Sequence, residues 1–154
     1  MNCIFTGHRQ LPDDPSPLRR ALAEEIARQR AAGVTDFLDG GAAGFDLLAA
    51  EAVLEAKADD PAISLWMILP YEGQDHYYSA PDKARYRAIL QRADKVRYVA
   101  AHYYTGCLLA RDRVLAEAAH VCVCYLTASS GGTAYTVRQC AARDVPIVNL
   151  ADLL

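Results

Sequence analysis

Residues 34–56 read VTDFLDGGAAGFDLLAAEAVLEA. The apolar run over residues 34–38 predicts a buried strand, and the glycines that follow predict a tight turn. From residue 44 to residue 58 apolar side chains recur at helical spacing, which predicts a helix. A strand that passes through a short turn into a helix is half of a βαβ unit. This stretch therefore predicts an α/β protein with parallel strands.

The same alternation of strand and helix runs along the whole chain. Gly33 ends the helix before the second strand, and Pro61 and Pro70 bound the third strand. We predict strands over residues 3–6, 34–38, 63–69, 95–99, 121–126 and 146–150, and helices over 18–30, 44–58, 82–92, 107–119 and 132–143. The predicted fold is α/β: a single Rossmann-like three-layer sandwich with a mostly parallel sheet of about six strands flanked by helices, in one domain over residues 1–154.

The composition is that of a globular protein, with 53% hydrophobic and 23% charged residues. A formal net charge of −3 argues against nucleic acid as a partner, because non-specific binding to nucleic acid needs a basic surface. No apolar run reaches the roughly 20 residues of a membrane span, and the N-terminus lacks a basic signal region. We therefore expect no membrane association and a cytoplasmic location.

The five cysteines show no metal-binding or disulfide pattern, since they include no C-x-x-C pair and no zinc-type spacing. Cys122 and Cys124 alternate along a predicted strand and so share one face of the sheet. We interpret all five as small, reduced core residues and predict neither a metal site nor a cofactor.

Two glycine-rich turns lie where a predicted strand meets a predicted helix: residues 40–44, GGAAG, and residues 130–133, SGGT. The first N–H groups of a helix have no partner within the helix, and glycine lets an anion approach them. Gly41 and Gly44 match the second and third glycines of the dinucleotide fingerprint G-x-G-x-x-G, but Asp39 stands at the first, and no P-loop lysine follows. The alternative for the first turn is a tight turn without a ligand.

Further polar residues follow other strands and are expected at the same edge of the sheet. Thr6, Gly7, His8 and Arg9 end the first strand, and the arginine fork matches a phosphate. Asp46 either caps its helix or accepts a hydrogen bond from a ribose hydroxyl. Residues 71–78, YEGQDHYY, either stack on a base or form a contact surface for another protein.

Taken together, these blocks resemble the SLOG superfamily of Rossmann-like proteins, and are most similar to its YspA/YpsA-like, DUF1273-type families. The likeness rests on four segments: residues 6–9, TGHR; residues 40–46, GGAAGFD; residues 111–113, RDR; and residues 131–137, GGTAYTV. It implies a pocket for a nucleotide or nucleotide-derived ligand, in a sensor or binding protein. A homodimer is a possible assembly.

The resemblance also bears on catalysis. Related LOG proteins are nucleoside monophosphate N-glycosidases with the signature P-G-G-x-G-T-x-x-E, and Thr136 stands here in place of the glutamate. A hydroxyl cannot replace that carboxylate, which favours a binder over an enzyme. The alternative function is such a phosphoribohydrolase, or a related nucleotide hydrolase, that uses Asp46 or Glu51. The similarity to DprA raises a third option, binding of single-stranded DNA, against which the net charge argues.

From the motifs and the resemblance we predict a pocket at the carboxyl edge of the sheet. Gly41, Gly44, Gly132 and Thr133 would donate to phosphate, Arg9 and Arg111 would neutralise its charge, Asp46 would accept from ribose, and Tyr71 would contact the base. The complete predicted site is Thr6, Gly7, His8, Arg9, Gly40, Gly41, Ala42, Gly44, Asp46, Pro70, Tyr71, Arg111, Gly131, Gly132, Thr133 and Thr136.

Overall fold

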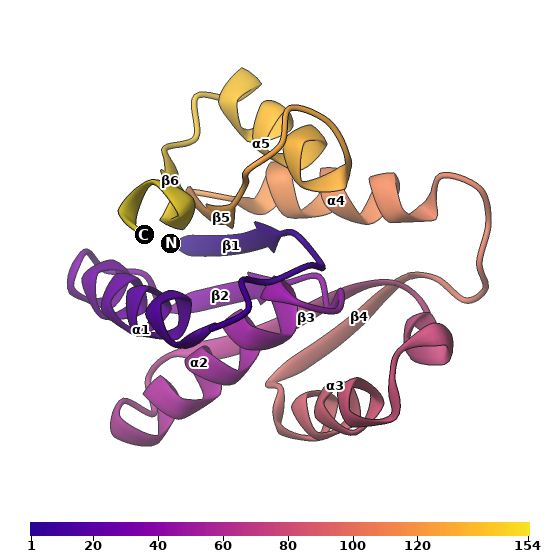
Figure 1. The fold of residues 1–154 in the computed structure, drawn as a ribbon, viewed down its shortest axis with the longest axis horizontal. Helices are drawn as coiled ribbons and strands as arrows, with labels where there is room; N and C mark the ends of the chain where they lie inside the picture. The colour runs from indigo at the N-terminus through magenta and orange to yellow at the C-terminus, as the bar shows by residue number, and fades with distance from the viewer.

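A single sheet of six strands, each parallel to its neighbours, organises the protein, as a computed structural model that describes all 154 residues shows. The strands lie in the order β4-β3-β2-β1-β5-β6 (Figure 1). Their bounds are β1 (Asn2–Gly7), β2 (Asp36–Asp39), β3 (Ser64–Tyr71), β4 (Lys95–Ala100), β5 (Val121–Tyr125) and β6 (Ile147–Asn149). The predicted α/β, Rossmann-like fold is confirmed.

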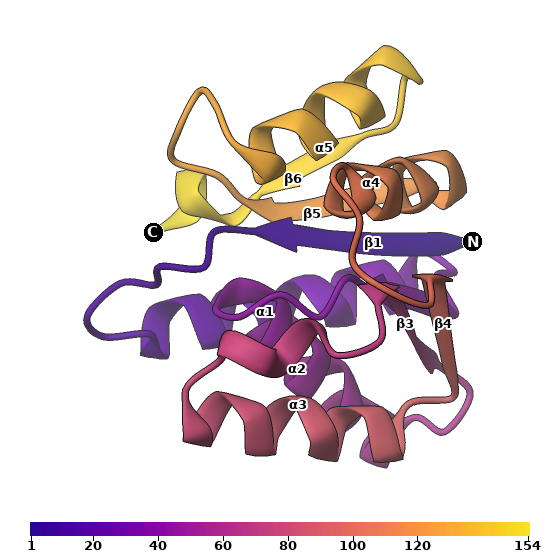
Figure 2. The same cartoon turned by 90° about the vertical axis from the view of Figure 1, so that its right-hand side faces the viewer.

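Five helices cover the two faces of this sheet (Figures 1 and 2). One face carries α1 (Ser16–Ala31), α2 (Phe45–Asp59) and α3 (Ala80–Arg92), and the other carries α4 (Cys107–Ala118) and α5 (Gly132–Ala142). Right-handed crossovers explain the division, because the chain moves from β1 outward to β4 and then returns to β5 on the other side of β1. Two short 3₁₀ helices, η1 (Gln74–Tyr77) and η2 (Leu150–Leu153), complete the chain.

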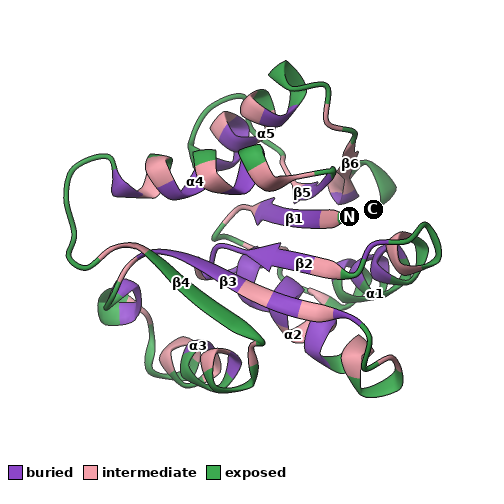
Figure 3. Cartoon of the chain, turned by 180° about the vertical axis from the view of Figure 1, so that it is seen from behind, coloured by how far each residue is buried: buried purple, intermediate pink, exposed green.

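The alternation of side chains along each strand divides the apolar core into two layers. Phe5 and Phe37 belong to the larger cluster beneath α1, α2 and α3, whereas their neighbours Ile4 and Leu38 belong to the smaller cluster beneath α4 and α5. The central strands are therefore buried on both sides, while the edge strand β4 is mostly exposed (Figure 3). This arrangement is why the central strands read as continuous apolar runs.

All five cysteines are free and buried, as the sequence predicted. Cys122, Cys124 and Cys140 pack together in the smaller cluster, and no group of residues has the makeup of a metal site. None of the helices combines the length and the apolar character that crossing a membrane requires.

The strand order reverses between β1 and β5, and this reversal positions the site. Each of these strands continues at its carboxyl end into a segment that leads away on a different face: β1 toward α1 and β5 toward α5. Open α/β sheets hold their ligands in the crevice that such a divergence creates. The carboxyl ends of β1 and β5 are therefore where a ligand site is expected.

Candidate functional site

A cavity of about 480 Å³ lies at the carboxyl ends of these central strands, and it is called the cleft below. Its volume is within the range of small-molecule sites. Nine of the sixteen predicted site residues line it, together with seven others. The lining residues are Phe5, Thr6, Gly7, His8, Arg9, Ala42, Asp46, Tyr103, Gly106, Leu108, Leu109, Arg111, Asp112, Leu115, Gly132 and Thr133.

The start of α5 presents free backbone donors at the cleft. Gly131 precedes the helix with φ of 98°, a conformation that favours glycine, and a side chain there would point into open space. The N–H groups of Gly132, Thr133 and Ala134 have no acceptor in the chain, and no side chain caps this helix. These donors lie at the positive end of the helix dipole, so this end of the cleft favours an anion.

The first glycine turn differs, and the prediction that the N–H of Gly41 donates to phosphate is corrected here. The N–H of Gly41 donates to Asp39 Oδ1 at 2.8 Å, and the N–H of Ala42 donates to Asp46 Oδ2 at 3.2 Å. The chain's own carboxylates thus occupy these donors and make the turn locally acidic. Its glycines permit close packing instead, because a Cβ on Gly41 would lie 2.7 Å from Leu69 Cδ2 and one on Gly44 would collide with the Arg9 backbone.

Two carboxyl groups are buried side by side beneath the cleft. Asp39 is fully buried and Asp46 is 5% exposed. Asp39 Oδ2 and Asp46 Oδ1 have no hydrogen-bond partner. Burial raises the pKa of both groups: that of Asp46 to about 7, although Arg111 lowers it, and that of Asp39 well above its ordinary value, with the negative charge of Asp46 adding to the effect. Asp46 is a lining residue of the cleft, and its Oδ1 is buried there without a hydrogen-bond partner.

Arg111 is bonded within the protein, so its side chain has a structural role in this region instead of the predicted role of neutralising a phosphate. Its Nε donates to Asp112 Oδ1 at 2.8 Å, and an Nη group donates to the carbonyl oxygen of Gly40. Arg111 and Asp112 are both buried. Gln74 also donates to the Gly40 carbonyl, at 3.2 Å, and Tyr78 donates to that of Gly41, at 2.8 Å. Side chains from α4 and from the region of η1 therefore fix the conformation of the first turn.

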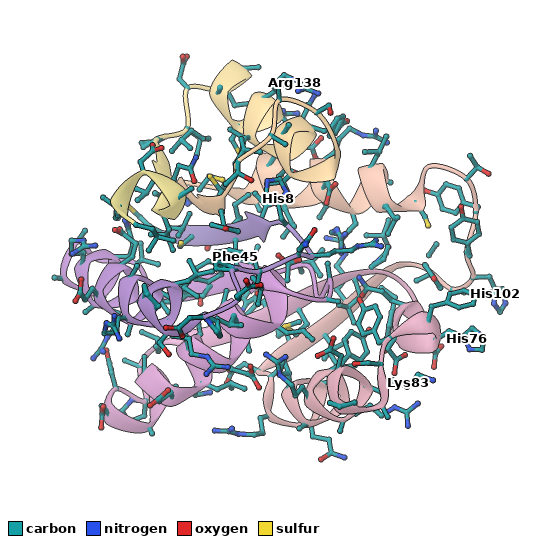
Figure 4. The ribbon with its side chains drawn as sticks, viewed as in Figure 1. His8, Phe45, His76, Lys83, His102 and Arg138 are labelled. Carbon is teal, nitrogen blue, oxygen red and sulfur yellow. The ribbon has the colours of Figure 1, made fainter.

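The end of β1 contributes one structural side chain and one free cation. His8 lies between β1 and the segment after β5 (Figure 4), and its Nε2 accepts a hydrogen bond from the N–H of Thr127 at 2.8 Å. Arg9 is exposed and forms no ion pair in the chain. It lines the cleft and two adjoining cavities. Arg9 is therefore placed to meet an anion at the mouth of the cleft.

The remaining predicted residues lie outside the cleft. Pro70 is buried in β3, and Tyr71 contacts the ring of Tyr103, which does line the cleft. Thr136 is fully buried and donates through Oγ1 to the carbonyl oxygen of Gly132 at 3.0 Å. The other four that do not line it are Gly40, Gly41, Gly44 and Gly131. Glu51, the second carboxylate considered for catalysis, binds Arg85 at 2.6 Å and is not a cleft residue.

Sequence reasoning missed several lining residues, of which Asp112 and Tyr103 are the most polar. Both belong to the connection that returns the chain from β4 to β5, which passes over the reversal in strand order. The adjacent charges at 111 and 112, in a helix otherwise rich in apolar residues, were the one available signal. A buried arginine in a helix requires a partner, and its neighbour supplies it.

Comparisons with known proteins identify relatives of this chain. The family model described as YpsA, the YspA SLOG family, matches residues 5–145. UPF0398 protein BH1768 of Halalkalibacterium halodurans is 30% identical over 89 residues, which are 58% of this chain and 47% of that protein. UPF0398 protein SERP1017 of Staphylococcus epidermidis matches to the same extent. The match thus spans about half the length of these relatives.

Among solved structures, DNA processing protein A from Helicobacter pylori superposes with a TM-score of 0.69 at 19% identity, over 96% of this chain and 63% of that one. The same protein from Streptococcus pneumoniae gives a TM-score of 0.67 at 14% identity, over 95% and 48%. These similarities show the fold. The Helicobacter pylori structure describes a single-stranded DNA binding mode. The prediction that argued against nucleic acid as a partner is therefore wrong, because overall net charge does not decide this question for the fold.

Proposed function

The chain belongs to the YspA SLOG family, and from that premise we propose that its cleft binds the phosphate and ribose of a nucleotide-derived ligand, as a sensor or binding protein. The observation that carries the proposal is that hydrogen-bond donors and a hydrogen-bond acceptor belong to residues that line one cavity. Gly132 and Thr133, whose N–H groups are free, and Arg9 line it together with Asp46, whose Oδ1 is buried without a hydrogen-bond partner. A nucleotide offers the matching groups, which are an anion and neighbouring hydroxyls.

The phosphate would bind at the start of α5. The N–H groups of Gly132, Thr133 and Ala134 point from the positive end of the helix dipole, and Gly132 has no Cβ to keep an anion away. Arg9 is unpaired and exposed, so it can move onto the phosphate without breaking an ion pair. The N–H groups of Gly41 and Ala42 already donate to Asp39 and Asp46, so we assign the first turn no phosphate contact.

The ribose would bind at Asp46. Its Oδ2 already accepts from Ala42, whereas Oδ1 is buried without a partner, which is unfavourable until a hydroxyl donates to it. Because the pKa of Asp46 is raised to about 7, the group would ionise more readily when a donor stabilises its charged form. Ligand binding and deprotonation of Asp46 are then coupled.

Hydrolysis of the N-glycosidic bond is the second candidate, and the raised pKa of Asp46 favours it. A carboxyl group that titrates near pH 7 can take a proton from water as the water oxygen bonds to ribose C1′. The C1′–N bond would break, and the base would leave with its electron pair and gain a proton. Glu51 is excluded from this role by its ion pair with Arg85.

The test is thermal unfolding of the purified protein with nucleoside monophosphates, ADP-ribose, NAD, cyclic nucleotides, inorganic phosphate and single-stranded oligonucleotides. A ligand at a hundred times its Kd adds about 2.7 kcal/mol, which raises Tm by roughly 5–10 °C. Gly132→Val and Arg9→Ala should lose most of the shift. Arg20→Ala removes the same charge from an exposed position of α1 and should keep it.

A Val at position 132 is compatible with the fold, because the nearest atom to its Cβ would be Asp112 Oδ2 at 3.7 Å. Absence of any shift, or equal shifts in all three variants, would refute phosphate binding at α5. Assay of the same mixtures for free base separates the two candidates. Base release that Asp46→Asn abolishes would establish hydrolysis, and release no faster than in buffer would leave binding alone.

A further inference from the structure

The cleft continues into two further cavities on the side of η1. The first, of about 320 Å³, shares Arg9, Tyr103 and Leu108 with the cleft. The second, of about 750 Å³, shares Tyr71, Tyr77 and Tyr103 with the first. Tyr103 thus lines all three cavities. The three cavities adjoin in a track from the start of α5, past Arg9, to the loop that carries η1, and their combined volume is larger than one nucleotide needs.

Three tyrosines line the outer part of this track, and we call Tyr71, Tyr77 and Tyr103 the tyrosine surface. Tyr77 is 90% exposed and Tyr103 is 62% exposed. Tyr71 and Tyr103 meet edge to face with their ring centroids 5.5 Å apart, which fixes the orientation of Tyr103. Exposed rings held beside a cavity offer flat faces on which a base can stack.

The charges along the track also suit a second nucleotide. Lys83 lines the outermost cavity and forms no ion pair, and it lies with His76 and His102 at the same end of the molecule (Figure 4). The acidic neighbour Asp75 is paired with Arg87 at 3.2 Å. Asp82, which lines the middle cavity, is paired with Arg85 at 3.1 Å. A free cation therefore stands at each end of the tyrosine surface: Arg9 at the cleft and Lys83 at the far end.

We infer that the cleft and the tyrosine surface together bind two linked nucleotides, the first in the cleft, the linking phosphate near Arg9, and the base of the second on Tyr103 and Tyr77, with Lys83 placed to meet the next phosphate of a longer strand. This inference rests on the proposed function, because it extends the same site. The shared chemistry of two bases joined through phosphate belongs to a free dinucleotide and also to the end of a single-stranded nucleic acid. A free dinucleotide would end in the outermost cavity, whereas a single-stranded nucleic acid would continue beyond it.

Calorimetric titration tests the inference with four probes: AMP, the dinucleotide pApA, the dinucleotide NAD, and a 5′-phosphorylated adenine strand of about eight nucleotides. A base stacked on tyrosine strengthens binding about 5- to 150-fold, so pApA or NAD should bind at least about fivefold more tightly than AMP. The strand will bind more tightly than either dinucleotide if nucleic acid is the source, and no more tightly if a free dinucleotide is.

Two variants locate the gain in affinity. Tyr77→Ala changes a residue that lines only the outer cavities, so it should reduce the affinity for the two-base probes to that for AMP and leave AMP unchanged. Lys83→Ala should weaken binding of the strand alone, because only the strand has a phosphate beyond its second nucleoside. Tyr104→Ala is the matched control, since Tyr104 is an exposed neighbour of Tyr103 that lines none of the three cavities. It should behave as the wild type.

Each other result counts against a distinct claim. Equal affinity of the wild type for AMP and every two-base probe would overturn this inference and leave the proposed function standing. Binding of none of the probes would overturn both. A dimer in sedimentation equilibrium that Tyr77→Ala dissociates, without a change in nucleotide affinity, would show that a second copy of the chain covers the tyrosine surface, and the inference would be wrong.

Discussion

Asparagine in place of Asp46 should remove a pH dependence of stability that the buried carboxyl group imposes. In the folded protein burial raises the pKa of Asp46 from its ordinary value of 3.8 to about 7. Between these two values the folded state holds a proton that the unfolded state has released. The contribution of Asp46 to stability therefore falls as pH rises through this window, is largest below about pH 4, and reaches its lower plateau above about pH 7.

The magnitude follows from the same difference in pKa. Each pH unit inside the window changes the free energy of unfolding by about 1.4 kcal/mol for one proton. The range from about pH 5 to pH 8 includes about two pH units of this window. Over that range the free energy of unfolding should therefore fall by about 3 kcal/mol more for the wild type than for Asp46→Asn. Because the negative charge of Asp46 also raises the pKa of Asp39, the difference between the two proteins reports the removal of Asp46 together with its effect on Asp39. Asparagine can still accept the hydrogen bond from Ala42.

Urea unfolding at several pH values measures this difference directly. Asp13→Asn is the control, because Asp13 is exposed and its curve should run parallel to that of the wild type. Parallel curves for the wild type and Asp46→Asn would refute the reasoning. They would mean that the Asp46 carboxyl titrates at its ordinary value. The proposal that Asp46 Oδ1 is buried without a partner until a ribose hydroxyl donates to it would then be wrong.

Three further outcomes are expected. Arg111→Met should lower the free energy of unfolding by about 3–5 kcal/mol, because it leaves Asp112 buried without its partner; a loss below about 1 kcal/mol in urea unfolding would contradict this. Gly41→Ala should lower Tm far more than Gly73→Ala, since both glycines have positive φ but only the first Cβ meets neighbours, the nearest 2.7 Å away; similar melting curves would argue against the packing role. Ellman's reagent should leave the native thiols unmodified and label all five cysteines after denaturation, because every one is buried; rapid labelling of the native protein would count against it.

Most of the fold could be predicted from the sequence because each local signal agrees with the global arrangement. The run over residues 63–69 is apolar at nearly every position, and the structure places β3 there, covered on both faces. Proline at the start of α1 and Ser79 at the start of α3, which accepts from Asp82, begin helices where the pattern begins. The 3₁₀ helix η1 was not predicted, since a polar, tyrosine-rich segment has no periodicity to read.

The two glycine turns could not be told apart from sequence. Both place glycine between a strand and a helix, and glycine serves equally for a close approach of protein atoms and for a close approach of a ligand. Only tertiary contacts separate them: a Cβ at position 41 would meet Leu69, whereas one at position 131 would meet nothing. Asp39, which departs from the dinucleotide fingerprint, was the sequence's one indication, because a carboxylate in that place occupies the turn's own donors.

The corrected role of the first turn strengthens the case for the cleft. A turn that bound phosphate would duplicate what α5 provides, and the cleft would then hold donors on both sides. The first turn is instead bonded to a carboxyl group that offers an acceptor: the N–H of Ala42 donates to Asp46 Oδ2, and Asp46 Oδ1 is left without a partner. Burying two carboxyl groups is unfavourable for stability. A ligand that carries both an anion and a hydroxyl donor satisfies the two sides at once, and inorganic phosphate in its ionised form satisfies only one. The affinity of the cleft for a nucleoside monophosphate should therefore exceed its affinity for phosphate by more than stacking of the base contributes.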